Sequence, residues 1–506
     1  MAYHESMYFL VFLPVVLIGY QLAPKRVRFG VLLFFSYCFY FLFSHRLIVY
    51  LLGATTITYL TGRLVATGEK KRRKTILIVG VWLLLGMLLV MKYSGFFAEN
   101  VNALFGTINL GLRLPGRFLL PLGISFYTLS AIGYMADVYW KKIEPEKNIA
   151  KLALFLSFFP IIMEGPICMY SDTTETLAKG EDIRSENLIR GYMRIGWGLL
   201  KKVVIADRLY VVVQTLFDGY ASYHGVMIVV AAVSYTVQLY MEFSGCMDIV
   251  IGSAECFGVT LPENFAQPFV SKNASEFWRR WHISLGRWFK TYIFYPVSMS
   301  KLTRKWNRFA KKHTSKYIKL MVASAIALFP VWVCNGLWHC ANWSYLFYGM
   351  YYFVVIMIEL MLEPAVKKLC AAWKIAEDAA WWNVLRILKT WVIIFTGELF
   401  FRADTLGIGM HMFRSLFHDF SIQKLWDGTL LTLGLGRVEI GIILVSLLIV
   451  GVVNHFREQQ IDVRGVILQK RLPVRWLVYL ALIFVVLIFG AYGPGYQEVD
   501  LIYAGF

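Results

Sequence analysis

The sequence has little charge and few acidic residues. Only 16% of its 506 residues are charged, whereas 58% are hydrophobic. This apolar content exceeds what the core of a single soluble domain can bury, which excludes an ordinary water-soluble enzyme. The formal net charge is +19, but the Lys and Arg residues stand in short clusters between apolar runs. That distribution is typical of cytoplasmic loops and argues against a nucleic-acid partner.

Several familiar signatures are also missing. No stretch matches the phosphate-binding P-loop, the Gly-x-Ser-x-Gly turn of serine hydrolases, or the His-Glu-x-x-His zinc motif. The seven cysteines are odd in number and lie mostly inside apolar runs, so we expect packing residues and no disulfide framework. Cys334 and Cys340, on either side of His339, are interpreted in the same way. We predict no metal and no tightly bound cofactor.

Apolar runs of membrane length, separated by basic clusters, make up most of the chain. A hydrocarbon core of ~30 Å takes about 20 apolar residues per helix. Helices satisfy their own backbone hydrogen bonds in lipid. We therefore predict an all-α, multi-pass membrane protein with about 11–13 helices, without an internal repeat, a low-complexity region or a soluble catalytic domain.

The basic clusters predict the orientation of the chain. Tyr8–Ala23 has no basic stretch before it and no cleavage site after it, so we interpret it as a first transmembrane helix and not a removed signal. The positive-inside rule places Lys25–Arg28 in the cytoplasm, which puts the N-terminus and, by parity, the C-terminus outside. Lys301–Lys319 is expected to be a cytoplasmic loop. Between residues 142 and 301, two or four crossings fit equally well.

Three stretches depart from a simple membrane helix. Lys92–Arg117 is too irregular to span and is expected to be an external loop with an interfacial helix. Pro160 interrupts Leu152–Met169, which predicts either a cavity-lining break or a plain kink. Arg194–Val213 carries charges in mid-run, so we expect a tilted or interfacial element packed into the bundle.

His339 stands at the boundary of two apolar runs, Leu320–Leu337 and Trp343–Leu362. An ionisable residue in such a position is a candidate functional group, because lipid offers it no hydrogen-bond partner. If the segment is helical, Asn342 lies one turn away on the same face and can orient the imidazole. A neutral imidazole can remove a proton from an alcohol. A packing or interfacial histidine is the competing interpretation.

His282 lies in a second polar region, Trp278–Phe289. Aromatic and leucine residues recur there at helical spacing, which predicts one interfacial helix with its arginines off the apolar face. These arginines are Arg279, Arg280 and Arg287. They can bind phosphates of a small-molecule donor, or they can anchor the helix to anionic lipid headgroups.

Polar residues also interrupt the apolar run near residue 240. Glu242, Ser244 and Asp248 are close in sequence, and the last two are one helical turn apart. We interpret the carboxylates as part of a structural network in preference to direct proton transfer. Four further acids inside apolar runs are expected to be bundle-interior partners and not catalysts: Asp137, Glu164, Glu359 and Glu398.

The sequences Phe277-Trp-Arg-Arg-Trp-His-Ile-Ser-Leu285, Pro262-Glu-Asn264 and Gly336-Leu-Trp-His-Cys-Ala-Asn-Trp343 together resemble the membrane-bound O-acyltransferase (MBOAT) family. They are most similar to the bacterial branch that contains alginate O-acetyltransferase, and more distantly to teichoic-acid D-alanyl transferase. The detailed resemblance covers residues 120–350. Glu242 departs from the Asp of this branch's Tyr-Phe-Asp-Phe-Ser-Gly pattern.

The resemblance implies one MBOAT domain over residues 1–506, built around a central funnel. Its parts would be N-terminal helices (1–117), a catalytic core (118–362) and C-terminal helices (363–506). His339 would be the general base and His282 a second catalytic or structural group. The remaining predicted site residues would shape the pocket or bind the donor: Trp338, Asn342, Arg279, Arg280, Arg287, Glu242, Ser244 and Asp248.

The implied reaction moves an acyl group, expected to be acetyl, from a cytoplasmic thioester to a hydroxyl outside the cell. The donor would be acetyl-CoA or an acyl-carrier phosphopantetheine, and the acceptor a polysaccharide or an acyltransferase partner protein. The protein would lie in the lipid of a bacterial cell membrane. Two alternatives stay open, namely D-alanyl transfer to teichoic acid and a proton-coupled transporter or flippase that uses the histidine and buried acids as a relay.

Overall fold

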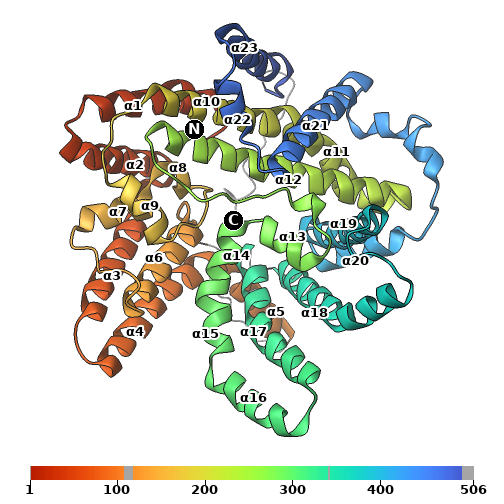
Figure 1. Cartoon of the computed structure of the whole chain (residues 1–506), viewed down its shortest axis with the longest axis horizontal. Coiled ribbons are helices and arrows are strands. Elements are labelled where there is room, and N and C mark those ends of the chain that lie inside the picture. The colour runs from red at the N-terminus through yellow and green to blue at the C-terminus, as the bar shows by residue number, and fades with distance from the viewer. Residues whose placement is uncertain (1, 108–117, 340–341, 493–506) are drawn as a thin grey trace. The chain divides into compact units, whose positions relative to one another are not determined.

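The computed structural model describes residues 2–107, 118–339 and 342–492. Within these ranges the chain forms helices joined by loops, and a single bridge pairs Phe265 with Trp281 (Figure 1). This confirms the predicted all-α class. Cys340, residues 108–117 of the predicted external loop, and residues 493–506 at the C-terminus lie outside the described ranges.

In the part of the chain that the structure describes, seven stretches are long and apolar enough to cross a membrane, which confirms a multi-pass membrane protein. Lys25–Ala66 and Lys70–Phe105 each contain two α-helices. Because length and composition alone identify these stretches, the predicted total of about 11–13 helices stays a prediction. The seven stretches are Lys25–Ala66, Lys70–Phe105, Val226–Cys256, Lys316–His339, Trp343–Ala372, Arg437–Glu458 and Leu472–Phe489.

The described residues form two compact units. Unit 1 comprises residues 2–199 and 246–263, and unit 2 comprises residues 200–245 and 264–492. The helix α12 (Val226–Cys256) is continuous and contributes residues to both. The predicted boundaries at residues 117 and 362 stay predictions.

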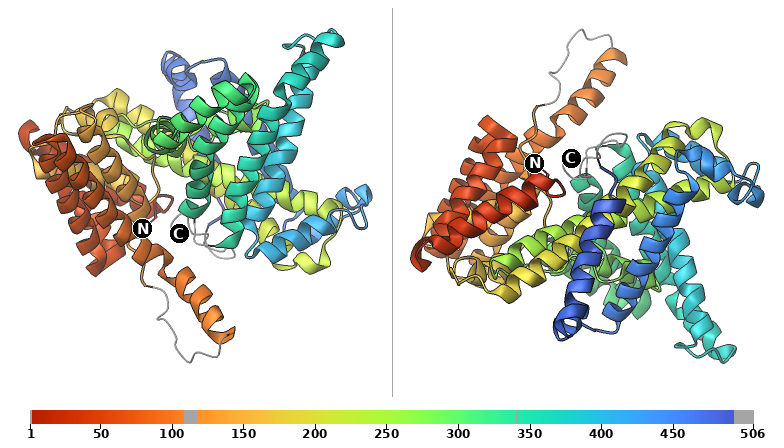
Figure 2. Two further views of the ribbon diagram at one scale, coloured as in Figure 1. Left: turned by 90° about the horizontal axis from the view of Figure 1, so that it is seen from below. Right: turned by 90° about the horizontal axis from the view of Figure 1, so that it is seen from above.

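Unit 1 is an array of helices whose first members lie side by side (Figure 2). A Cβ atom at Gly80 would lie 2.5 Å from the Thr61 hydroxyl, so α3 and α4 pack closely. Pro160 stands in the first turn of α8, and Phe158 separates α8 from α7 at the predicted break. The α-helices are α1 (Leu13–Leu22), α2 (Arg28–Ser44), α3 (Ile48–Ala66), α4 (Lys70–Leu88), α5 (Ser94–Thr107), α6 (Ile124–Tyr139), α7 (Ile149–Ser157), α8 (Phe159–Ile162), α9 (Tyr170–Leu177) and α10 (Ser185–Leu199).

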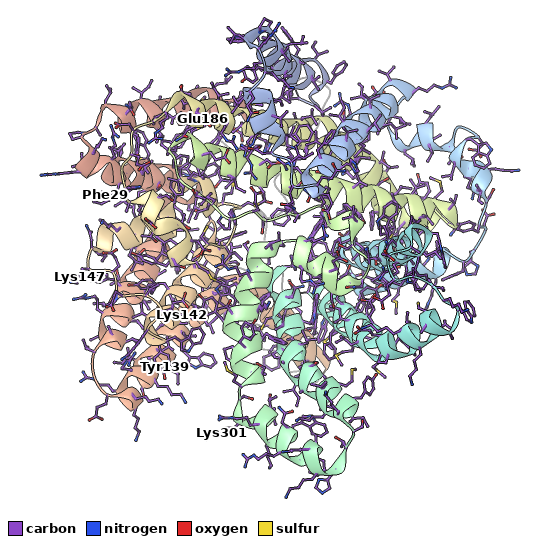
Figure 3. All side chains as sticks on the ribbon, viewed as in Figure 1. Phe29, Tyr139, Lys142, Lys147, Glu186 and Lys301 are labelled. Carbon is purple, nitrogen blue, oxygen red and sulfur yellow. The ribbon has the colours of Figure 1, made fainter. Side chains whose placement is uncertain are left out.

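Basic residues follow α6 in unit 1, where a cytoplasmic loop is predicted. Figure 3 marks two of them, Lys142 and Lys147. The ammonium group of Lys142 lies 3.2 Å from a carboxylate oxygen of buried Asp137 in α6. This acid therefore has a partner close by in the chain.

Unit 2 holds the remaining helices. It begins with a π-helix, η5 (Leu200–Ala206), and continues through α11 (Asp207–Asp218) into α12. The other α-helices are α13 (Ala274–Arg280), α14 (Ile283–Phe289), α15 (Tyr295–Ser298), α16 (Lys301–His313), α17 (Lys316–His339), α18 (Trp343–Ala372), α19 (Ala380–Arg402), α20 (Leu406–Ser415), α21 (Arg437–Glu458), α22 (Val463–Leu468) and α23 (Leu472–Phe489).

Two glycines bring α17 and α18 into close contact. A Cβ atom at Gly336 would lie 2.4 Å from the carbonyl oxygen of Tyr345, and one at Gly349 would lie 2.3 Å from that of Trp332. Any larger residue would force the helices apart. This contact occurs beside the end of α17, where His339 lies.

Two polar or basic segments of this region are helical. The polar stretch around Glu242 lies within α12, which runs to Cys256. The basic segment that is predicted to be a cytoplasmic loop contains α16, which Ser300 caps by accepting a hydrogen bond from the Thr303 N–H group. Figure 3 marks its first residue, Lys301.

The helix α16 forms because its charges occupy one side only. Thr303 and Ala310 are buried, while the lysines and arginines are exposed. The charge run therefore follows the helical period and leaves one face for packing.

Candidate active site

His339 is the last residue of α17 and is buried. Among the described residues, four aromatic rings surround its imidazole. Their centroids lie 4.9 Å (Phe401), 5.1 Å (Trp338), 6.1 Å (Tyr348) and 6.2 Å (Tyr345) from that of the histidine. These rings come from α17, α18 and α19, so three helices of unit 2 hold this side chain in an apolar environment.

Asn342 does not share a helical face with His339, and the prediction that it does is wrong. The helix α17 ends at His339, and Asn342 has an extended backbone as the N-cap of α18. Its side-chain oxygen accepts a hydrogen bond from the Ser344 N–H group, and its amide nitrogen donates to the carbonyl oxygen of Asp404 at 3.1 Å. Asn342 therefore caps a helix in this structure.

His282 lies between α13 and α14 in the left-handed region, with φ 47° and ψ 52°. The prediction of one continuous interfacial helix over residues 278–289 is therefore wrong. The chain leaves the helical path because Asn264–Ala266 pairs with it. Ala266 donates to the Arg280 carbonyl oxygen and Ile283 donates to that of Asn264, both at 3.0 Å. A left-handed conformation is uncommon for a residue with a side chain and marks a special position.

The side chain of Asn264 fixes the tautomer of His282. Its Oδ1 atom accepts hydrogen bonds from the Ser284 backbone N–H group at 3.1 Å and from the Ser284 hydroxyl at 2.8 Å. Because a backbone N–H group can only donate, the atom that faces it must be the oxygen. His282 Nδ1, 3.2 Å from the same oxygen, must therefore carry a proton, which leaves the lone pair on Nε2.

Burial lowers the pKa of His282 to about 3. The residue lies outside the seven candidate membrane spans and is 3% exposed. Its imidazole is consequently neutral at physiological pH.

Trp338 joins the two histidines. Its ring centroid lies 5.1 Å from that of His339 and 5.4 Å from that of His282. Phe243 of α12 covers another edge of His282, with centroids 4.9 Å apart. The structure thus brings together both predicted catalytic residues and one predicted pocket residue.

Glu242 and Ser244, on either side of Phe243, contact buried lysines of the π-helix η5. Lys202 Nζ lies 3.3 Å from a Glu242 oxygen and 2.7 Å from an Asp207 oxygen. Lys201 Nζ donates to the Ser244 hydroxyl at 3.0 Å. These contacts fix α12 against η5 beside the residue that touches His282. In the segment Arg194–Val213, which was predicted to be tilted or interfacial, the charged side chains of Lys201, Lys202 and Asp207 are therefore buried in the protein.

Asp248 belongs to a separate network in unit 1. Its carboxylate accepts a hydrogen bond from buried Arg194 at 2.9 Å. The same guanidinium also pairs with Glu255 and Glu263. Asp248 is thus an ion-pair partner in this structure.

The three predicted donor-binding arginines differ in their surroundings. Arg280 is engaged by Glu276 and by Glu458 at the end of α21. Arg279 and Arg287 are exposed. The exposed guanidinium groups of Arg279 and Arg287 can be reached from solvent.

Sequence reasoning gave no site role to four residues near the histidines. Asn264 belongs to Pro262-Glu-Asn264, one of the segments that resemble the MBOAT family. Its place shortly before the segment that contains His282 was the sequence signal that could have marked it. Tyr345, Tyr348 and Phe401 carried no signal, because aromatic residues are common in every apolar run of this chain. No group of three or more His, Cys, Asp or Glu side chains within the described ranges is arranged to hold a metal ion.

The chain matches proteins of known class. The sequence model of the membrane-bound O-acyltransferase (MBOAT) family matches residues 146–310. Over 419 residues the chain is 30% identical to the protein named "Probable alginate O-acetylase AlgI" of Pseudomonas syringae pv. tomato. The aligned region covers 82% of this chain and 75% of that protein.

Two further relatives have other named acceptors or acyl groups. The peptidoglycan O-acetyltransferase of Helicobacter pylori is 27% identical over 446 residues, covering 82% of this chain and 79% of that protein. The teichoic acid D-alanyltransferase of Bacillus subtilis is 27% identical over 293 residues, covering 57% of this chain and 70% of that protein. The chain belongs to the membrane-bound O-acyltransferase family and is an O-acyltransferase.

Proposed function

We propose that this enzyme transfers an acetyl group from a cytoplasmic thioester to a hydroxyl group outside the cell, with His339 as the general base. The observation that carries the proposal is the meeting of two buried histidines on one indole ring, Trp338. The acceptor would be a polysaccharide or an acyltransferase partner protein that completes delivery. The setting would be a bacterial cell membrane, with both chain termini on the outer side.

The reaction needs one proton to be moved twice. His339 removes the proton from the acceptor hydroxyl while that oxygen attacks the thioester carbonyl carbon. The carbon–sulfur bond then breaks, and the leaving thiolate takes the proton back from the imidazolium. The products are an oxygen ester and a free thiol. The energy of the thioester drives the transfer, so no nucleotide hydrolysis is needed.

The aromatic enclosure supports this role for His339. The four rings hold the imidazole in a fixed place, and a positioned general base typically contributes 10²–10⁴-fold to the rate. His282 is held neutral with its lone pair on Nε2, so it can accept a hydrogen bond from a reacting group but does not supply a positive charge.

The donor side is proposed at the exposed arginines of the α13–α14 segment. Arg279 and Arg287 would contact donor phosphates, either of acetyl-CoA or of an acyl-carrier phosphopantetheine. Glu458 and Glu276 hold Arg280, which favours a structural role for that residue.

Acetyl is preferred over D-alanyl because the relatives named for acetyl transfer match a larger part of this chain. Their alignments cover 82% of it, whereas that of the Bacillus subtilis D-alanyltransferase covers 57%. Membership of an acyltransferase family also favours this function over a proton-coupled transporter.

The test is the ester content of the cell envelope in cells that carry wild type or His339→Ala. Mild alkali releases ester-linked acyl groups, which mass spectrometry identifies. We expect His339→Ala to lower released acetate by about 10²-fold or more. His313→Ala, an exposed histidine on α16, is the matched control and should leave the acetate unchanged.

Membrane abundance of each variant is measured alongside. Acetate at the wild-type level in His339→Ala would contradict the proposed general base. Released D-alanine that depends on His339 would keep the base and replace acetyl with the alternative acyl group.

A further inference from the structure

We infer that Glu398 of α19 is a positioning residue for His339 and acts through Tyr348. The inference rests on the proposed role of His339 as the general base. It adds an acidic residue to the site that does not touch the reacting atoms.

A buried hydrogen bond connects the two residues. The Tyr348 hydroxyl donates to Glu398 Oε1 at 2.8 Å, and both side chains are at most 2% exposed. The Tyr348 ring stands edge-on to the His339 imidazole, at an interplanar angle of 89°. The carboxyl group therefore fixes the rotation of a ring that forms one wall of the histidine's enclosure.

Glu398 differs from other acids inside the apolar runs. Asp137, Glu242 and Glu359 each have a lysine within ion-pair distance. Over the described part of the chain Glu398 has no such partner, and its Oε2 atom has no hydrogen-bond partner. A buried carboxyl group without a cation is costly to retain.

The helix α19 contacts the histidine's enclosure twice. Phe401 lies one turn after Glu398, and its ring centroid is 4.9 Å from that of His339 and 4.8 Å from that of Tyr348. Gly397 permits this approach, because a Cβ atom there would lie 2.4 Å from the Tyr352 hydroxyl. One face of α19 thus holds Tyr348 with a hydrogen bond and supports His339 with an aromatic edge.

His339 needs such support because it ends its own helix. His339 is the last residue of α17, and the rings of α18 and α19 limit where its imidazole can point. A general base acts only when its nitrogen is aligned with the acceptor hydroxyl, and small displacements reduce the rate strongly.

Tyr351 offers a matched control on the same helix. Its hydroxyl also donates to α19, to the Ile393 carbonyl oxygen at 2.9 Å. Its ring contacts Tyr352. Tyr348→Phe and Tyr351→Phe therefore remove hydrogen bonds of similar length between the same two helices, but only the first adjoins His339.

The readout is the initial rate of alkali-labile acyl incorporation into the envelope after induction, per mole of enzyme in the membrane. We expect Tyr348→Phe and Glu398→Ala each to lower this rate by about tenfold. The double variant should lose no more than either single variant, because both changes break one link. The amide oxygen of Glu398→Gln can still accept a hydrogen bond from the Tyr348 hydroxyl. This variant should therefore keep most of the wild-type rate.

Thermal unfolding of the detergent-purified variants separates positioning from folding. Tyr348→Phe should unfold at the same temperature as Tyr351→Phe while differing from it in rate. Wild-type rates in Tyr348→Phe and Glu398→Ala would overturn the inference, and so would losses that multiply in the double variant or a Glu398→Gln variant as slow as Glu398→Ala.

His339→Ala, measured in the same series, distinguishes a failure of the positioning role of Glu398 from a failure of the proposed general base. If His339→Ala abolishes incorporation while Tyr348→Phe does not change it, only the positioning inference fails. If His339→Ala keeps the wild-type rate, the proposed general base itself fails.

Discussion

Asn264 and His282 show how one side-chain oxygen can determine a chemical role. Asn264 Oδ1 accepts hydrogen bonds from the Ser284 N–H group and from His282 Nδ1, so the imidazole has a defined tautomer and orientation. The sequence predicted that His282 belongs to the site. It could not predict the tautomer, because that depends on a contact across a break between two short helices.

The buried, neutral state of His282 predicts how stability depends on pH. Its pKa is about 3 in the folded protein and about 6.5 when unfolded. The unfolded chain therefore binds the proton more tightly, and this contribution to stability is present above pH 6.5 and is lost as the pH falls toward 3. The unfolding temperature of the purified protein should fall between pH 6.5 and 5.

The variant His282→Gln should show a smaller fall over the same range, because glutamine does not titrate. His313→Gln, which changes an exposed histidine, should behave as wild type. Identical pH dependence in wild type and His282→Gln would contradict the neutral assignment.

At the scale of helices, most apolar runs were located correctly from their length. Buried Lys202 lies within ion-pair distance of Glu242 inside α12, and the charges of α16 follow the helical period. Conversely, regular spacing over residues 278–289 suggested one helix, but pairing with Asn264–Ala266 breaks it. That break depends on a tertiary contact, which no local pattern records.

The ion pair between η5 and α12 predicts a large loss of stability in Lys202→Met. Lys202 and Glu242 are fully buried, and the lysine also serves Asp207. Removing one partner of a buried pair typically costs about 3–5 kcal/mol, because the remaining charge is left uncompensated. Thermal unfolding in detergent should show this loss.

Lys311→Met, on the exposed face of α16, is the control and should unfold like wild type. Adding Glu242→Gln to Lys202→Met should restore part of the loss, since it removes one of the orphaned carboxylates. Equal unfolding temperatures for Lys202→Met and Lys311→Met would show that the pair contributes little.

For the whole molecule, family and class followed from the sequence, whereas the arrangement of the site did not. The motifs around His282 and His339 identified both histidines, but their meeting on Trp338 depends on the folding of segments far apart in the chain. The aromatic residues of α18 and α19 became recognisable only through their positions around His339.

Membrane topology gives a prediction at this scale. If α16 faces the cytoplasm, Lys312→Cys should react with a membrane-impermeant maleimide only after the cells are permeabilised. Wild type is the control, because its described cysteines are buried or partly buried. Labelling in intact cells would reverse the proposed orientation of both termini.

The end of α17 at His339 has an electrostatic consequence. Aligned peptide dipoles give the C-terminal end of a helix the equivalent of roughly half a negative elementary charge. His339 is the final residue of a 24-residue helix, so its imidazole stands at this end. If His339 is the proposed general base, the field of the helix favours the positive ring that forms when the acceptor hydroxyl loses its proton. The backbone of α17 would then supply a fixed counter-charge to the transition state without an acidic side chain against the base.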